Sequence, residues 1–144
     1  MKAIVQRVKE AKVLVAGEII GAIGRGALIF LAVEKTDTEA DVEAMVKKIS
    51  FLRMFPSPEG GRMELANFEV NGEYLVVSQF TLAADLSKGN RPSFDNAAPP
   101  ELAEKLYEFF VQKLKVGPCR VATGKFRAMM DVPLVNDGPV TFIL

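Results

Sequence analysis

Short apolar stretches rich in β-forming residues dominate the opening of this chain, and they constrain its fold more than any other feature of the sequence. The stretches are separated by charged or turn-forming residues and occupy positions 3–8, 12–15 and 18–23. This pattern is typical of short strands, so we predict an opening β-meander. The next stretch, 26–33, is apolar throughout, which predicts a central strand covered on both faces.

Two amphipathic helices are expected further along the chain. The first follows Thr36-Asp-Thr-Glu39, which has the form of a capping box, and continues for about 17 residues before Pro56. The second begins near Pro100, has glutamates near its start and lysines near its end, and stops at Gly117-Pro118. Its apolar stripe, which we expect to be buried, consists of Leu102, Leu106, Phe109, Phe110 and Leu114.

The remaining segments have strand character. Segments 63–68 and 73–80 flank the turn-forming pair Asn71-Gly72, which predicts a β-hairpin. Further strands are expected at 118–123, 128–135 and 140–144. This order of elements predicts one α+β domain over residues 1–144, with mostly antiparallel β-sheets that form a barrel-like core and with two amphipathic helices.

The residue types that are absent exclude several kinds of active site. The chain has no histidine, so it cannot form a Ser-His-Asp or Cys-His relay or a His-ligated zinc site. Its single cysteine, Cys119, cannot form an internal disulfide bond or a CxxC site. We therefore expect neither a metal nor a cofactor.

Charge and hydropathy limit the partners that the chain can bind. Eighteen Lys and Arg residues balance eighteen Asp and Glu residues, so no strong field is available to hold a DNA duplex or an anionic membrane. Any contact with RNA is expected to be local. The longest apolar run, 27–33, has seven residues and is too short for a membrane span, and charges interrupt the N-terminal segment. We expect a soluble cytoplasmic protein.

Two short motifs are candidates for a functional site. Ser78-Gln-Phe-Thr81 places polar groups at the end of an apolar strand, just before the long irregular stretch 83–100. The same polar groups can instead serve only the neighbouring backbone. The second motif, Asn136-Asp-Gly-Pro139, locally predicts a turn between the last two strands.

Three segments carry these motifs in a distinctive combination: Val77-Ser-Gln-Phe-Thr-Leu82, Gly89-Asn-Arg-Pro-Ser-Phe94 and Leu134-Val-Asn-Asp-Gly-Pro-Val-Thr-Phe142. In this order and spacing they resemble the D-aminoacyl-tRNA deacylase family. The likeness extends from the opening Ala-Ile-Val-Gln-Arg-Val to the last residue. It implies a homodimeric hydrolase that cleaves the ester between a D-amino acid and the 3′-terminal adenosine of a tRNA.

The resemblance also implies roles for both motifs. Ser78, Gln79, Phe80 and Thr81 would lie at the ester, with backbone N–H groups stabilising the oxyanion and the 2′-hydroxyl of the tRNA assisting. Gly138-Pro139 would be a cis pair that reaches into the partner subunit's pocket and rejects L-amino acids by steric clash. Such a wall excludes glycine poorly, so glycyl-tRNA is expected to be a further substrate.

Other residues enter through the same resemblance. Arg7 corresponds to the residue that orients the Gly-Pro pair, and Phe126 and Met130 correspond to positions that line the pocket. Arg127 departs from the family, which usually has a small residue at this position. This departure would alter the rim of the pocket or a contact with the tRNA.

The residues leave three alternatives open. Lys88 and Arg91 are either phosphate contacts for the end of the tRNA or ordinary solvated charges. A second mechanism makes Thr81 a covalent nucleophile, although no histidine is available to deprotonate it. A different class of protein, a non-catalytic dimer that binds tRNA ends, would use the same pocket without turnover.

Overall fold

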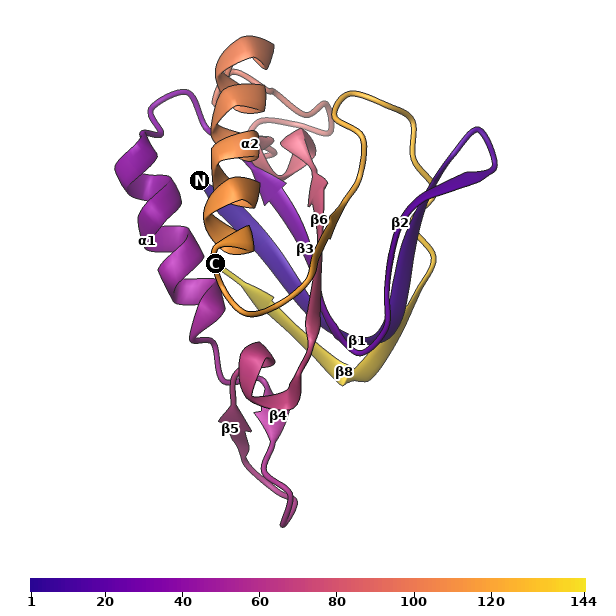
Figure 1. The fold of residues 1–144 in the computed structure, drawn as a ribbon. Coiled ribbons are helices and arrows are strands. Elements are labelled where there is room, and N and C mark those ends of the chain that lie inside the picture. Colours follow the sequence, from indigo (N-terminus) through magenta and orange to yellow (C-terminus); the bar gives the residue numbers. More distant parts are fainter.

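Strand β1 (Lys2–Val15) organises the sheet in the computed structural model, which describes residues 1–144 (Figure 1). It pairs antiparallel with β3 (Gly26–Ala32) along its first half and with β2 (Glu18–Ile23) along its second half. Ala16 and Gly17 both have positive φ and form the turn between β1 and β2. The predicted meander is therefore wrong: the segment forms one long hairpin, and the exposed pair Lys9-Glu10 lies within an unbroken strand.

The main sheet is mixed, but most of its strand pairings are antiparallel, as predicted. Strand β8 (Leu134–Ile143) pairs antiparallel with β1, but β6 (Glu73–Ser78) lies parallel between β3 and β7 (Val121–Thr123). Strand β2 approaches β7 so closely that a Cβ atom at Gly21 would lie 2.4 Å from the carbonyl oxygen of Thr123. The sheet is thus a nearly closed barrel, and the predicted α+β class with a barrel-like core is confirmed.

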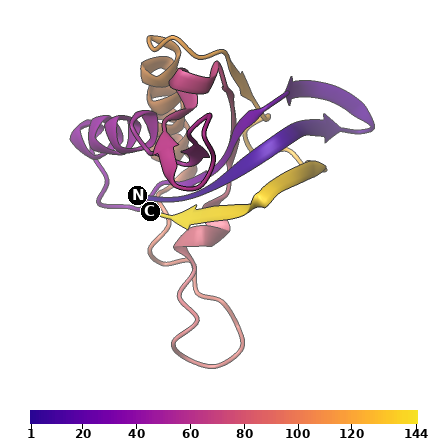
Figure 2. The same cartoon turned by 90° about the horizontal axis from the view of Figure 1, so that it is seen from below.

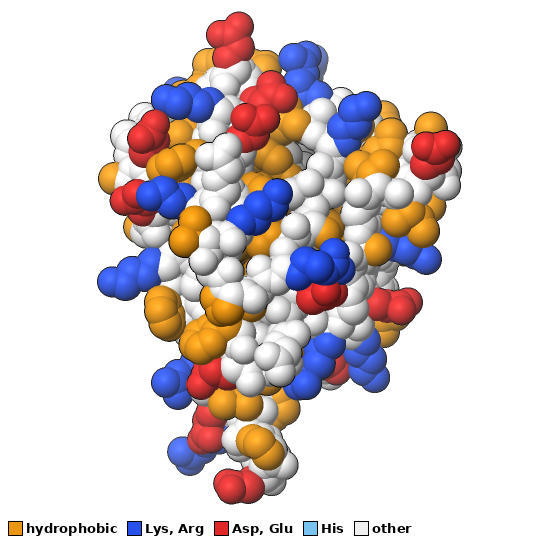
Figure 3. Space-filling view, viewed as in Figure 1, with side chains coloured by type: hydrophobic (Ala, Val, Ile, Leu, Met, Phe, Trp, Pro, Cys, Tyr) orange, Lys and Arg blue, Asp and Glu red, His pale blue; other side chains and the backbone are white.

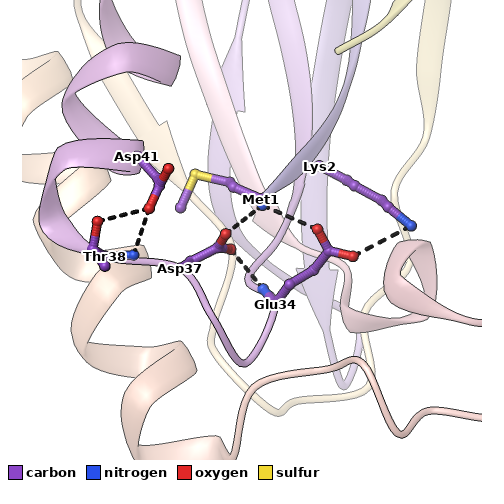
Figure 4. A network of polar contacts seen from close by, with 6 residues as sticks. All are labelled: Met1, Lys2, Glu34, Asp37, Thr38 and Asp41. Carbon is purple, nitrogen blue, oxygen red and sulfur yellow. Dashed lines mark hydrogen bonds and ion pairs between the residues drawn. The ribbon is translucent and has the colours of Figure 1, made fainter.

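Both predicted helices are present and lie against each other beside the sheet (Figure 1). Helix α1 (Glu39–Ser50) has 12 residues, fewer than expected, and its N-cap is Thr38. The Thr38 N–H and hydroxyl donate to Oδ2 of Asp41 at 2.8 and 2.7 Å, in place of the predicted Thr36 box (Figure 4). The start is displaced because Asp37 belongs to the preceding turn, where its carboxylate accepts the N–H of Glu34.

Helix α2 (Pro100–Lys115) agrees with its predicted bounds. Its buried residues are Leu106, Tyr107, Phe110, Val111 and Leu114. Leu102 and Phe109 are only half-buried, so the predicted stripe is partly wrong. The buried face includes Tyr107 because the tyrosine hydroxyl donates to the carbonyl oxygen of Val76 at 2.9 Å, which anchors the helix on β6.

The predicted hairpin between 63–68 and 73–80 is wrong. Strand β5 (Met63–Leu65) pairs instead with β4 (Phe55–Pro56), and Asn67–Val70 form a 3-10 helix. Four consecutive residues of β6, 74–77, are buried. This burial on both faces suits a central parallel strand rather than one arm of an exposed hairpin.

The last third of the chain contains fewer strands than expected. Strand β7 has three residues, and the predicted strand 128–135 is mostly irregular, with one isolated bridge between Asp131 and Leu14. Strand β8 continues through the second motif, so no turn separates two final strands. The irregular segment 124–133 is consequently free to form a wall beside β6.

Two hydrophobic clusters hold these elements together. The larger cluster joins α1 and α2 to the sheet, and the smaller one fills the barrel with Val8, Ala11, Val13, Ile23, Leu28, Leu75 and Val77. Acidic and basic side chains are interspersed over the face shown in Figure 3. No helix is both long enough and apolar enough to span a membrane.

Candidate active site

The end of β6 carries the first polar motif. Ser78 is the last residue of β6, Gln79 follows, and Phe80–Ala83 form a short 3-10 helix, η2. The N–H of Gln79 donates to the carbonyl oxygen of Leu31 at 2.8 Å, which fixes the motif to the end of β3. The buried part of β6 therefore leads directly into residues 78–80, which are partly or fully exposed to solvent.

A cavity of about 550 Å³ opens beside this motif. Its walls come from the ends of β3 and β6, the start of α2 and the irregular segment 124–133, and ten of its 14 lining residues are hydrophobic. Among them are five predicted site residues, Ser78, Gln79, Phe80, Phe126 and Met130, together with Arg127. The cavity suits a ligand of limited size that is held mainly by apolar contact.

Thr81 is exposed and does not line the cavity. Its hydroxyl oxygen accepts a hydrogen bond from Nε2 of Gln79, and no carboxylate or amine contacts it as a base. The first N–H groups of a helix have no acceptor within that helix, which leaves those of Phe80 and Thr81 at the start of η2 without one. The motif thus offers backbone donors more readily than an activated hydroxyl.

One lining residue of the cavity, Phe126, is supported by an aromatic contact. The rings of Tyr107 and Phe126 lie 5.8 Å apart between centroids. Burial raises the pKa of Tyr107 well above its usual range, so this phenol stays protonated and keeps its hydrogen bond to β6. Tyr107 therefore acts as a fixed support for Phe126 and not as an acid or base.

The second motif lies on β8, away from the cavity of its own chain. Gln6 pairs with Thr141 and Val8 with Asn136, so Arg7 alone faces the four residues 137–140. Within this bulge the Gly138-Pro139 peptide bond is cis, and Gly138 has a φ of +121°. Both residues are exposed.

Arg7 holds the bulge against β1. Its side chain is 11% exposed, and its Nε lies 3.1 Å from Oδ2 of Asp137. Its Nη1 donates to the carbonyl oxygen of Met54 at 2.7 Å, and the guanidinium carbon lies 5.9 Å from the ring centroid of Phe55. A Cβ atom at Gly138 would lie 2.8 Å from Nη2 of Arg7, so the guanidinium packs directly on this glycine.

The long loop that contains Lys88 and Arg91 projects from the body of the protein (Figure 2). Both side chains are exposed, form no ion pair and do not line the cavity. Paired backbone hydrogen bonds between Asp85 and Ser93 close the base of the loop. The loop is tied to the site by Phe94, whose ring centroid lies 5.0 Å from that of Phe80.

Several cavity residues were not identified from the sequence: Val33, Ala98, Pro100, Ala103, Ala128, Met129 and Val132. The small residues at the start of α2 leave space between the helix and β6. In the sequence, however, small residues at a helix start are equally consistent with tight packing. Met129 is 91% exposed, and its place beside the cavity depends on the irregular path of 124–133.

Comparisons with known sequences agree over almost the whole chain. A family model described as D-Tyr-tRNA(Tyr) deacylase matches residues 4–144. A D-aminoacyl-tRNA deacylase from Thermotoga petrophila is 55% identical over 144 residues, which are 100% of this chain and 96% of that protein. A protein of the same name from Desulfatibacillum aliphaticivorans is 56% identical over 100% of this chain and 98% of its own length.

Solved structures agree with the fold. The c-Myc DNA Unwinding Element Binding Protein superimposes with a TM-score of 0.95 and 44% identity, over 100% of this chain and 97% of that one. A probable eukaryotic D-amino acid tRNA deacylase gives a TM-score of 0.85 over 99% of this chain and 97% of that one. At 18% identity, this second likeness supports the fold alone.

Proposed function

The chain belongs to the D-Tyr-tRNA(Tyr) deacylase family, and we propose that it hydrolyses the ester bond between a D-amino acid and the 3′-terminal adenosine of tRNA. The products are the free D-amino acid and a tRNA that can be charged again. The observation that carries this proposal is the position of Ser78, Gln79 and Phe80 on the wall of the cavity, in a chain that matches the family from end to end. The reaction belongs in the cytoplasm, the compartment of translation.

Backbone groups supply the catalysis in this proposal. The N–H groups of Phe80 and Thr81 stabilise the negative charge that develops on the carbonyl oxygen of the ester when water attacks it, an effect worth about 10² to 10³ in rate for each donor. Two observations support this role: these donors have no acceptor within η2, and the Thr81 hydroxyl has no neighbouring base. The 2′-hydroxyl of the terminal ribose then relays the proton of the attacking water to the leaving 3′-oxygen, since no histidine is present.

Selection between D- and L-amino acids uses a second copy of the chain. Gly138 and Pro139 are exposed and lie outside the cavity of their own subunit, so they are available to enter the cavity of a partner. In the homodimer their carbonyl oxygens form a wall that an L side chain would strike and a D side chain would avoid. Glycine has no side chain to strike it, so glycyl-tRNA is expected to be a further substrate.

A single assay tests the reaction. The purified protein is incubated with D-tyrosyl-tRNA or L-tyrosyl-tRNA in the presence of a chelator, and release of the amino acid is followed. Rapid release from the D-ester alone supports the proposal. Tight binding of D-tyrosyl-tRNA without release would instead identify a non-catalytic protein that binds tRNA ends, and equal release from both esters would overturn the proposed selection.

A further inference from the structure

Arg127 occupies a backbone position that normally favours glycine. The N–H of Ala128 donates to the carbonyl oxygen of Lys125 at 3.2 Å, which closes a turn with Phe126 and Arg127 at its centre. Arg127 has a φ of +61°, the left-handed conformation that the third residue of a type II turn requires. A residue with a Cβ atom adopts this conformation at a cost, and such outliers cluster at functional sites.

The surroundings of Arg127 leave its charge without a partner. It is the only charged residue that lines the cavity. None of the seven ion pairs of the chain involves it, and no hydrogen bond from its guanidinium is formed. The side chain is exposed, so the cation lies at the mouth of the cavity, not beneath its apolar walls. A free guanidinium in this position is suited to a ligand that carries an anion.

The chemistry of the substrate selects the anion. We propose that Arg127 binds the phosphate on the 5′ side of the terminal adenosine, an inference that rests on the function proposed above. In an aminoacyl ester the α-carboxyl group is esterified and the α-amine is a cation, so the amino acid offers no general partner for a guanidinium. The phosphate is present in every tRNA substrate, and the planar fork of an arginine matches two phosphate oxygens.

This role affects binding more than chemistry. The phosphate does not change charge when the ester is cleaved, so its contact with Arg127 is equally strong before and during the reaction. Loss of such a contact raises KM and leaves kcat nearly unchanged. It also removes one neutralised phosphate, so the slope of log affinity against log salt concentration becomes shallower by about one.

Nucleotide binding tests the inference without any catalytic step. Titration calorimetry compares 5′-AMP with adenosine for the wild-type protein, for Arg127→Gly and for Arg127→Lys. The glycine variant suits the positive φ and is expected to fold. Arg62→Ala is the matched control, because it removes an exposed arginine that has no ion pair and does not line the cavity. We expect wild type and the control to bind 5′-AMP about three to ten times more tightly than adenosine.

The expected pattern for the variants is a loss of this preference in Arg127→Gly and partial retention in Arg127→Lys. In deacylation assays, Arg127→Gly should raise KM for D-tyrosyl-tRNA by a similar factor. An unchanged preference for 5′-AMP and an unchanged KM in Arg127→Gly would overturn the role of Arg127. If wild-type protein fails to release D-tyrosine, the proposed function is wrong, and the nucleotide titration still decides whether Arg127 binds phosphate.

Discussion

Nε of Arg7 lies 3.1 Å from Oδ2 of Asp137 and 3.2 Å from the carbonyl oxygen of the same residue. These contacts join β1 to the bulge of β8 immediately before Gly138. The guanidinium is largely buried and also holds the carbonyl oxygen of Met54. Arg7 is therefore a clamp that fixes the position of the bulge from within its own subunit.

Replacement of Arg7 by alanine is expected to lower the free energy of unfolding by about 2 to 3 kcal/mol, because Asp137 and a backbone carbonyl lose a charged donor. Urea denaturation measures this change, with Lys12→Ala as the control for an exposed cation on the same strand. Discrimination between D- and L-tyrosyl-tRNA should fall in Arg7→Ala and stay unchanged in Lys12→Ala. Equal stability and selectivity in both variants would show that the clamp has no such role.

Gly138→Ala is expected to weaken selectivity by displacing the bulge. The new methyl group would lie 2.8 Å from Nη2 of Arg7 and from Cγ2 of Val140, and φ is +121°. Gly60→Ala is the control for backbone strain without crowding, since Gly60 has a φ of +81° but no atom within 4 Å of the added Cβ. We expect faster hydrolysis of L-tyrosyl-tRNA in Gly138→Ala only. A rise of the same size in Gly60→Ala would rule out crowding at Arg7 as the cause.

Thr81→Ala is expected to reduce kcat by less than about tenfold, because the backbone N–H that we propose as the oxyanion donor is retained. With a substrate that ends in 2′-deoxyadenosine the rate should fall far more, since this substrate lacks the hydroxyl that we propose relays the proton. Single-turnover rates for both cases give the comparison. A loss of several orders of magnitude in Thr81→Ala, with little effect of the deoxy substrate, would favour a covalent threonine ester.

The Met1 ammonium contacts the carboxylates of Glu34 and Asp37 (Figure 4), and these contacts make stability depend on pH. Burial lowers the pKa of the Met1 ammonium, but hydrogen bonds to Asp37 and Glu34 outweigh burial and raise the pKa above its ordinary value of 8.0. The ammonium therefore contributes its full stability below about pH 8, and this contribution is lost as pH rises through the higher folded value. Solvent screening limits the change to about 1 kcal/mol.

Melting temperatures measured from pH 7 to pH 10 test this dependence. The wild-type protein should lose more stability over that range than the Asp37→Asn variant. In that variant a neutral amide replaces the carboxylate that accepts a hydrogen bond from the Met1 ammonium. Parallel curves for the two proteins would mean that the pairing of the ammonium with Asp37 does not contribute.

The sequence was a good guide where a local signal determines the structure. Pro100 predicts the start of α2 and Gly117-Pro118 predict its end, and both signals lie in the local sequence. Strand pairing is not local: nothing near Glu73 indicates that β6 joins β3 in parallel, while Asn71-Gly72 suggests a hairpin that does not form. Burial of 26–33 on both faces was correctly predicted because an entirely apolar strand requires it.

The residues of the candidate site likewise fall into those that a local sequence signal indicates and those that only the tertiary fold brings together. Ser78 and Gln79 were found because polar residues follow a buried strand, whereas Ala103 lines the cavity only through the placement of α2 on the sheet. The bulge of β8 was interpreted as a turn because its local composition is that of a turn. Its partner on β1, Arg7, is 130 residues away, so the family resemblance indicated this arginine and the local sequence did not.

Mixed dimers test most directly whether one subunit selects the substrate for the other. Ala103→Trp in one chain blocks its cavity but leaves its Gly138-Pro139 intact, and Gly138→Ala in the other chain leaves its cavity open. The two chains carry different tags, so the mixed dimer can be isolated and its hydrolysis of D- and L-tyrosyl-tRNA measured. We predict that it cleaves only the D-ester, whereas the Gly138→Ala homodimer also cleaves the L-ester. Equal cleavage of the L-ester by both dimers would contradict selection across the subunit interface.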